Sequence, residues 1–408
     1  MITKIIFKEL LENFNSPKFK VIALIIISTI SLSSFLLIKD YKMRLNEYQL
    51  NKPKLGESRV SIQPSVLSIF YSGISKSMEE GVDIKPGTII MLPSKSILEF
   101  EFFSAKFPIP DIGYIVKIIM SLLVIIFAFD TFSGEKNTGT LRLLFSYSIS
   151  RSQVLIGKLL GHLLSIYIPF TFSFLIVILL IFISGFTIEG MEWVRILLFF
   201  MGSLIYIAIF TIITQFVSCS TALPSTSLVV CLIIWTCLTF GVTNLSDAIA
   251  RNLTNLKSAQ SLEEEKLLLY SFKDGLDGTN TGNIDDSDES LYKNLEEKES
   301  IFRNELTRYL EILKVLSRFA PIGPYTFFSS NITNSSLEDE TTYKRSVLEY
   351  RNVLYKNPEM ANTVKFNYKA NGLWVSLENT LVDILLLFMY LVLFLFAAFV
   401  SFEKYDIR

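Results

Sequence analysis

Six apolar runs, each long enough to cross a bilayer, constrain this chain more than any other feature. They lie at residues 20–38, 113–131, 154–184, 193–218, 225–244 and 379–402. A helix of about 20 mostly apolar residues crosses about 30 Å of hydrocarbon. The 408 residues are 50% hydrophobic and include 34 Phe, which exceeds the usage of ordinary soluble domains. The pattern predicts an α-helical polytopic membrane protein with six transmembrane helices.

Charge and cysteine content argue against several classes of protein. The net charge is −1, so the chain has no basic field to attract phosphates, and no nucleic-acid partner is expected. Cys219, Cys231 and Cys237 all lie in or beside one apolar run, which argues against a disulfide-stapled outer domain and a zinc cluster. No small-residue cleavage site follows the first run. We therefore expect a retained helix there and not a removed signal peptide.

The basic residues of the short polar segments indicate which side of the membrane each end faces. Lys and Arg concentrate in short cytosolic segments, whereas long segments cross with little regard to charge. The loop after the third run holds Glu189 and Glu192 and no basic residue before Arg195, so it is expected outside. Both termini, including the tail at 403–408, are predicted to be cytosolic. The basic residues that decide this are Lys4, Lys8, Lys18 and Lys20 before the first run, Lys136, Arg142, Arg151 and Lys158 in the second loop, and Lys404 and Arg408 in the tail.

The first nineteen residues have the pattern of an amphipathic helix. Apolar residues recur at helical spacing, and charged or amide side chains fill the other side. We expect residues 1–19 to form an elbow helix in contact with lipid at the inner interface, turned into the first span at Ser16-Pro17. An ordinary juxtamembrane stub is the alternative. The apolar positions are Ile2, Ile5, Ile6, Leu10 and Phe14.

Two long polar segments then lie outside the membrane. Residues 39–112 open with a polar continuation of the first helix to Leu50 and continue with short β-like runs, so we expect a small α/β domain. Residues 245–378 have helical periodicity in two places, so a mainly helical second domain is expected.

An apolar stretch, "RFAPIGPYTFF", interrupts the second polar segment at residues 318–328. Pro321 and Pro324 forbid a continuous helix, and the aromatic side chains favour an interface. We expect this stretch to reach the outer membrane surface or to pack against the spans.

The chain lacks the motifs of an enzyme or an ATPase. The nearest approach to a Walker loop is "SQVLIGKLL", which has no leading glycine and no Ser or Thr after the lysine. No cofactor site is predicted. His162, Asp130 and Asp383 lie in or at the ends of spans, where ionisable groups are costly and deserve functional suspicion. For each of them we favour a structural role over a part in transport, such as a proton relay.

The loop between the second and third runs, residues 132–153, is too charged and too patterned for a passive turn. Gly134 and Gly139 end the second span, and "TLRLLFSY" has the length and apolar face of a short surface helix. Ser150 with Gln153 predicts a capping box that begins the third span. A short braced helix could transmit force from a soluble partner. A surface connector without a partner is the alternative.

This loop also resembles a known family. "FDTFSGEKNTGTLRLLFSYSISRSQVLIGKLLG" is similar to the pattern of type-two ABC transporter permeases: an acidic residue, G-E-x-x-x-G-T-L, a Ser-Arg and a Gly-Lys. "FKELLENFNSPKF", "SVLSIFYSGIS", "RFAPIGPYTFF" and the six-span layout support the resemblance over most of the chain. "SYSIS" departs from it, because many relatives carry a Pro before the Ser-Arg.

The resemblance implies one membrane half of an exporter of the type V, ABCG-like fold. Such a half pairs with a second permease, identical or different, and with two ATPase subunits that bind ATP and Mg. The loop would be the coupling helix docked on the ATPase, the elbow helix would complete the dock, and spans one, two and five would line the path by alternating access. Frequent Ile, Lys and Asn favour a bacterium with an AT-rich genome, and the expected location is its plasma membrane. The matching positions are Glu135, Gly139, Thr140, Leu141, Arg142, Ser150, Arg151 and Lys158.

Two other classes of function stay open on the sequence alone. The first is a non-transporting assembly or signalling component whose outer domains bind an extracellular partner. The second is an enzyme that acts within the membrane through Asp130, His162 and Asp383. The substrate of an exporter, whether lipid, peptide, drug or ion, is not indicated by any motif.

Overall fold

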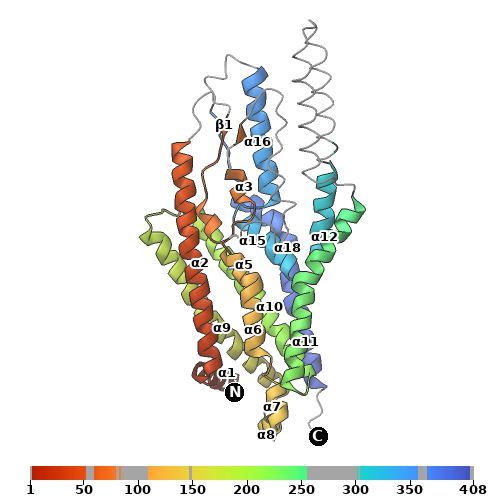
Figure 1. Cartoon of the computed structure of the whole chain (residues 1–408). Coiled ribbons are helices and arrows are strands. Elements are labelled where there is room, and N and C mark those ends of the chain that lie inside the picture. Colours follow the sequence, from red (N-terminus) through yellow and green to blue (C-terminus); the bar gives the residue numbers. More distant parts are fainter. Residues whose placement is uncertain are drawn as a thin grey trace.

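The computed structural model describes residues 2–51, 59–79, 82–83, 109–146, 149–254, 301, 304–356 and 365–404. Helices dominate these residues and form an upright bundle (Figure 1). Six helices in this part of the chain are long and apolar enough to cross a membrane, as the sequence predicts. They are Pro17–Leu50, Ile112–Thr138, Arg151–Ile183, Gly190–Ser220, Pro224–Leu253 and Leu373–Glu403.

Four of the spans consist of one helix each, and two are interrupted. The single helices are α2 (Pro17–Leu50), α9 (Arg151–Ile183), α10 (Gly190–Ser220) and α18 (Leu373–Glu403). The second span contains α5 (Ile112–Tyr114), a π-helical turn at Ile115–Met120 and α6 (Ser121–Ala128), and the chain continues beyond its end into α7 (Ser133–Thr138). The fifth contains α11 (Pro224–Thr236), a π-helical turn at Cys237–Gly241 and α12 (Val242–Leu253). Helix α2 continues past residue 38 to Leu50, as its polar extension predicts.

The two interrupted spans are joined where the first π-helical turn ends. A π turn spaces its backbone bonds more widely than an α turn and often lies at functional sites. The carbonyl oxygen of Lys117 accepts hydrogen bonds from the hydroxyls of Ser121 at 2.6 Å and Tyr206 at 3.2 Å. The indole of Trp235 in α11 donates to the Ser121 oxygen at 2.8 Å. Side chains of spans two and four therefore satisfy this backbone carbonyl, and the indole from span five is joined to it through the Ser121 hydroxyl.

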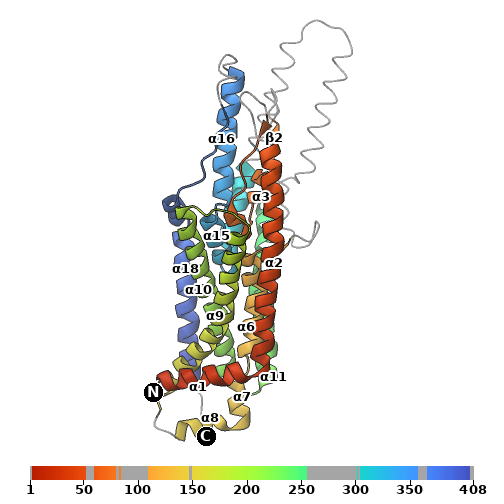
Figure 2. The same ribbon diagram turned by 90° about the vertical axis from the view of Figure 1, so that its left-hand side faces the viewer.

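Helix α1 (Ile2–Asn15) lies across one end of the bundle and not along the spans (Figure 2). The chain turns into α2 at Ser16, whose hydroxyl accepts a hydrogen bond from the backbone N–H of Phe19 at 3.1 Å, and Pro17 occupies the first helical position. The predicted turn at Ser16-Pro17 is thus confirmed. We call the end that carries α1, α7 and α8 (Thr140–Ser146) the α8 end.

Small residues on α9 allow α1 to approach closely. A Cβ atom added at Gly157 would lie 2.7 Å from Ile5, and one added at Gly161 would lie 2.6 Å from the Cβ atom of Glu9. One turn further along both helices, the amide of Asn13 donates to Ser165 at 3.0 Å. Each step is four residues on both helices, so residues 5, 9 and 13 lie against 157, 161 and 165 in register.

The opposite end of the bundle carries parts of both long polar segments. The first segment contributes strands β1 (Arg59–Val60) and β2 (Val82–Asp83), which pair antiparallel, a 3₁₀ turn at Val66–Ile69 and α3 (Ser75–Glu79). The second contributes a helix at 304–317, α15 (Ile322–Ile332) and α16 (Leu337–Lys356).

The described parts of the two long polar segments share one hydrophobic core. Val60 and Met78 of the first segment pack in one buried cluster with Tyr343, Val347 and other residues of the second. The backbone N–H of Ile74 also donates to the carbonyl of Ser335 at 3.1 Å. This association escapes sequence analysis because it joins positions more than two hundred residues apart.

The apolar stretch at 318–328 packs against the spans, as one of the two expected placements has it. Pro321 precedes α15, and Pro324 lies in its first turn, where proline is tolerated. The ring of Tyr325 stacks on Tyr206 of α10 with centroids 4.5 Å apart. Phe328 occupies the space beside Gly202, where an added Cβ would lie 2.1 Å from its ring.

Replacing Gly161 by Leu should displace α1 from α9, because the new side chain overlaps Glu9. Overpacking of this kind costs about 1–3 kcal/mol. Trypsin should then cleave faster at Lys4 and Lys8 in the solubilised protein, as followed by mass spectrometry. Gly134→Ala is the matched control, since its Cβ would make an ordinary contact at 3.6 Å. Unchanged cleavage in Gly161→Leu would contradict the close contact.

Tyr343 offers a test of the shared outer core. It is fully buried, and its hydroxyl has no hydrogen-bond partner among the described residues, so Tyr343→Phe should leave stability nearly unchanged. Tyr343→Ala should destabilise the core by about 3–5 kcal/mol, the usual cost of removing a large aromatic side chain. Limited proteolysis should then show faster cleavage within residues 59–79 as well as within α16. Protection of 59–79 in that variant would mean that the segments fold separately.

Candidate functional site

The α8 end presents a two-helix loop that projects beyond the spans. Helix α7 ends at Gly139, which has a φ of 76°, a left-handed conformation that favours glycine. The chain then turns into α8. Gly139, Thr140 and Arg142 are exposed, whereas Leu141 is only 1% exposed. The loop therefore has an outward tip and a buried anchor, and Leu141 packs in a cluster with Phe132, Val154, Leu155, Cys219, Ala398 and Phe402.

Polar contacts attach the base of this loop to the end of α10. The Nζ atom of Lys136 donates to the carbonyl oxygens of Cys219 and, at 3.2 Å, of Thr221. These are carbonyls at the C-terminal end of a helix, where a cation is favoured. In return the hydroxyl oxygen of Ser218 accepts hydrogen bonds from the backbone N–H groups of Phe132 and Ser133, both at 3.0 Å. The loop and α10 thus satisfy each other's backbone ends.

The other end of the loop is attached to α18. The guanidinium of Arg151 donates to the carbonyls of Phe402, at 3.4 Å, and Glu403, the last residues of that helix. Ser150 is the N-cap of α9, and its hydroxyl accepts from the backbone N–H of Gln153 at 3.4 Å, which is the N-cap half of the predicted capping box. Movement of the loop must therefore also move the ends of α9, α10 and α18 or break these bonds.

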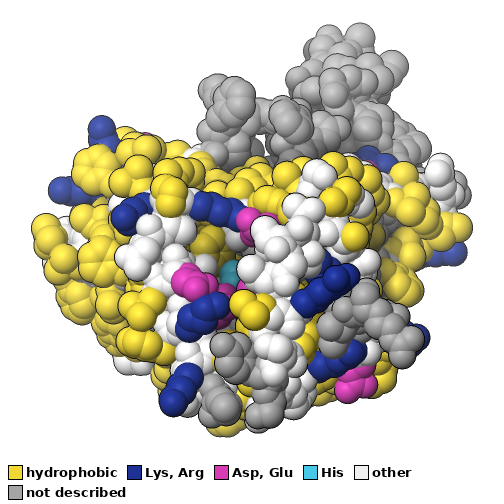
Figure 3. Space-filling model, turned by 90° about the horizontal axis from the view of Figure 1, so that it is seen from below, with side chains coloured by type: hydrophobic (Ala, Val, Ile, Leu, Met, Phe, Trp, Pro, Cys, Tyr) yellow, Lys and Arg dark blue, Asp and Glu magenta, His cyan; other side chains and the backbone are white. Residues whose placement is uncertain are grey.

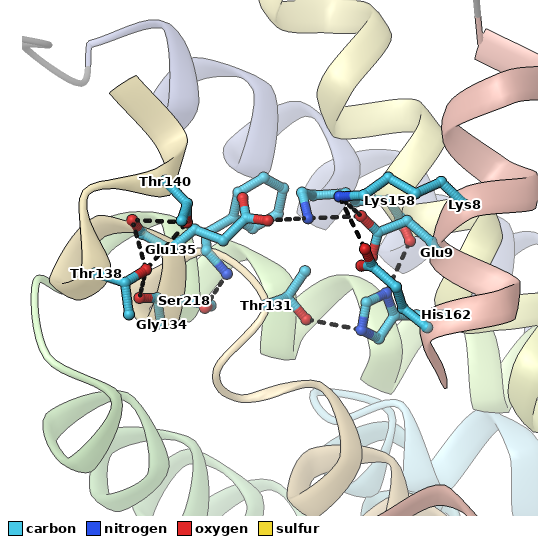
Figure 4. A network of polar contacts seen from close by, with 12 residues as sticks. Lys8, Glu9, Thr131, Gly134, Glu135, Thr138, Thr140, Lys158, His162 and Ser218 are labelled. Atoms are coloured by element: carbon cyan, nitrogen blue, oxygen red, sulfur yellow. Dashed lines mark hydrogen bonds and ion pairs between the residues drawn. The ribbon is translucent and has the colours of Figure 1, made fainter. Parts of the chain in front are cut away.

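A buried lysine lies at the centre of the α8 end (Figure 4). The Nζ atom of Lys158 lies 2.8 Å from a carboxylate oxygen of Glu9 in α1 and 2.8 Å from one of Glu135 in α7. Lys158 is 2% exposed and Glu9 is 5% exposed. Burial alone raises the pKa of Glu9, but the ammonium of Lys158 more than offsets this, so its pKa lies below the ordinary value. Glu9 is therefore a carboxylate at neutral pH.

His162 lies one turn beyond Lys158 and is buried beside this centre. Its Nδ1–H donates to the carbonyl of Lys158 at 3.0 Å, and its Nε2 lies 3.1 Å from the hydroxyl of Thr131. Figure 3 shows the imidazole of this single histidine at the floor of a hollow at the α8 end, with charged side chains around its rim. Both ring nitrogens have partners, which agrees with the structural role favoured from the sequence.

The two acidic residues suspected from the sequence are both ion-paired. Asp130 accepts two bonds from Lys18, at 2.9 and 3.0 Å. Asp383, which is fully buried, accepts a bidentate pair from Arg318 at 2.7 and 2.9 Å. Such pairing fits the structural reading, because an isolated carboxylate in a span is costly. Within the described ranges, no group of three His, Cys, Asp or Glu side chains could hold a metal ion.

The sequence predictions and the geometry agree only in part about this end. Of the eight positions matched to the family pattern, the structure brings Glu135 and Lys158 together, with Lys158 turned inward. Thr140, Arg142 and Gly139 lie at the exposed tip, and Leu141, Ser150 and Arg151 anchor the loop. Contact of any of these positions with an ATPase stays a prediction.

Sequence analysis missed Glu9 and the glycines that seat α1, although "GKLLG" carries the four-residue spacing of a close helix contact. It also missed two cations inside spans. Lys117 donates to the hydroxyl of Tyr71 at 3.4 Å, and Arg195 donates to the carbonyls of Ile332 at 2.8 Å and Asn371 at 2.7 Å. A single basic residue within an apolar run is the signal that could have revealed each.

Comparison with known proteins supports the resemblance. The family described as "ABC-2 family transporter protein" matches residues 3–407. The chain is 34% identical over 64 residues to "Probable ABC transporter permease protein NosY" of Stutzerimonas stutzeri, which is 16% of this chain and 23% of that protein. It is 36% identical over 61 residues to the protein of the same name from Pseudomonas aeruginosa, covering 15% and 22%.

The chain thus spans less than a quarter of the length of these two curated relatives, and its similarity to them is confined to that stretch. The family match, by contrast, covers nearly the whole sequence and includes all six apolar helices. Members of an ABC permease family work with ATP-binding subunits in general. From the six spans and the match over residues 3–407, the chain is a multi-pass membrane protein that belongs to the ABC-2 transporter family.

Proposed function

We propose that this chain is the membrane-spanning subunit of an ATP-driven exporter, with ATP and Mg bound by separate partner subunits. The complex would contain two such ATPases and a second permease, either a copy of this chain or a related one. The α8 end would face the cytosol of a bacterium, in accord with the basic residues of its short segments. The outer segments would cap the exit of the path.

The observation that carries the proposal is the construction of the α7–α8 loop. Its tip is exposed, while Lys136 donates to the end of α10, Arg151 donates to the end of α18, and Leu141 packs against the start of α9. A loop that only connected two spans would not need bonds to the ends of two other spans. A contact made at the tip can be transmitted to three spans because the loop is held rigidly at its base.

Charge reversal at the tip tests this role. Arg142→Glu should abolish stimulation of the partner's ATP hydrolysis by the permease, because it places a repulsive charge in the proposed contact. Membrane insertion should be unaffected, since the side chain is exposed. The measurement is ATPase activity of the complex purified through a tag on this chain. Lys404→Glu, another exposed charge reversal at the same end, is the matched control and should retain stimulation.

Two outcomes would contradict the proposal. Purification of the tagged chain without any protein carrying a Walker loop would favour a non-transporting assembly or signalling component. Full stimulation by Arg142→Glu would mean that the tip makes no contact with the ATPase.

A further inference from the structure

Lys158 is a charged residue buried at one end of the third span, where an apolar residue would be the ordinary choice. Its side chain is 3% exposed and lies between two carboxylates that come from different elements, Glu9 in α1 and Glu135 in α7. A buried ammonium needs hydrogen-bonded anionic partners, and here each available partner belongs to a segment at the α8 end. One side chain therefore joins α1, α7 and α9.

The surrounding packing makes this connection specific. Gly157 and Gly161 flank Lys158 along α9 and bring α1 close enough for Glu9 to reach the ammonium. The bond from Asn13 to Ser165 holds the register of the two helices one turn further on. On the other side, Glu135 lies in α7, one turn before the exposed tip of the loop. Among the described residues, the ion pairs that join α1 to α7 thus meet at this one ammonium group.

The charge of this cluster is not balanced within the triad. Two carboxylates face one ammonium, and the second oxygen of Glu135 is buried without a hydrogen-bond partner among the described residues. Loss of the lysine would leave two carboxylates facing each other in a poorly hydrated space. Neither carboxylate could then hold its element in the present position.

We infer that Lys158 is a positioning residue that ties the elbow helix α1 to the coupling loop α7–α8, so that both move as one body with α9. This inference rests on the proposed function, and it gives Lys158 a place in coupling other than a direct contact with the ATPase. An exposed fraction of 2% leaves no surface for such a contact. The ionic partners of Lys158 are Glu9 and Glu135 of the same chain.

Spin-label distances test the tie without any ATPase. Exposed positions at Lys4 in α1 and Ser146 in α8 are changed to Cys in a Cys237→Ser background, since Cys237 is the exposed native cysteine. Pulsed electron–electron double resonance on the full chain in lipid nanodiscs should give one narrow distribution of the distance between the two spin labels. Lys158→Met should lose it, because α1 and the loop then move independently. Glu12→Gln, at an exposed ion pair of the same helix, should keep it.

A neutral triple variant shows whether loss of the ion pairs, and not repulsion between the two remaining carboxylates, releases α1 from the loop. Glu9→Gln/Lys158→Met/Glu135→Gln removes all three charges, so folding is not opposed by buried unpaired carboxylates. The narrow distribution should still be lost, since no ionic bond remains between α1 and α7. A wild-type distribution in the triple variant, or in Lys158→Met alone, would overturn the inference.

The same variants in the complete complex test the consequence for coupling. The triple variant should co-purify with the ATPase, because the tip is unchanged, but its stimulation of ATP hydrolysis should fall about tenfold, within the usual range of a coupling free energy. Full stimulation would overturn the role of the tie. Absence of an ATPase from the wild-type complex would instead refute the proposed function, while the spin-label result would still decide whether the tie exists.

Discussion

A charge buried in an apolar bundle must be matched at short range, and the α8 end of this protein is arranged around that constraint. Lys158 can lie within α9 because Glu9 and Glu135 each approach it to 2.8 Å. Removing one partner of a buried ion pair typically costs about 3–5 kcal/mol, a large fraction of the stability of a domain. The positions of α1 and α7 are therefore linked through α9. The two cytosol-facing elements of the proposed transporter are not independent attachments.

Backbone ends impose a second constraint of the same kind. The last carbonyls of α10 and α18 have no partner within their own helices. Lys136 and Arg151, which flank the loop on either side, donate to them. Basic residues at this end consequently do two jobs. They satisfy helix C-termini, and they supply the excess of Lys and Arg on which the proposed cytosolic orientation rests.

Local signals in the sequence were sufficient for the parts of the fold that local physics decides. The six spans follow from runs of apolar residues, the bend at Ser16-Pro17 from a capping serine before a proline, and the start of α9 from Ser150. Contacts between distant segments could not be predicted in this way. Glu9, one of the two partners of Lys158, lies 149 residues earlier in the chain, and the shared core of the two polar segments joins Val60 to Tyr343. Local patterns in a single sequence do not identify which of many possible charged or apolar residues come into contact.

The distribution of ionic contacts along the bundle also bears on how such a protein could move. At the opposite end, Arg195 holds the carbonyls of Ile332 and Asn371, and Arg318 holds Asp383, so α10, α15 and α18 are fastened together. The second and fifth spans each contain a π-helical turn between these two fastened ends. Such turns are the natural places for a helix to bend, because their backbone bonds are already spaced irregularly. If the proposed function is right and force is applied at the α8 end, we expect spans two and five to bend at these turns before the ionic contacts at either end break.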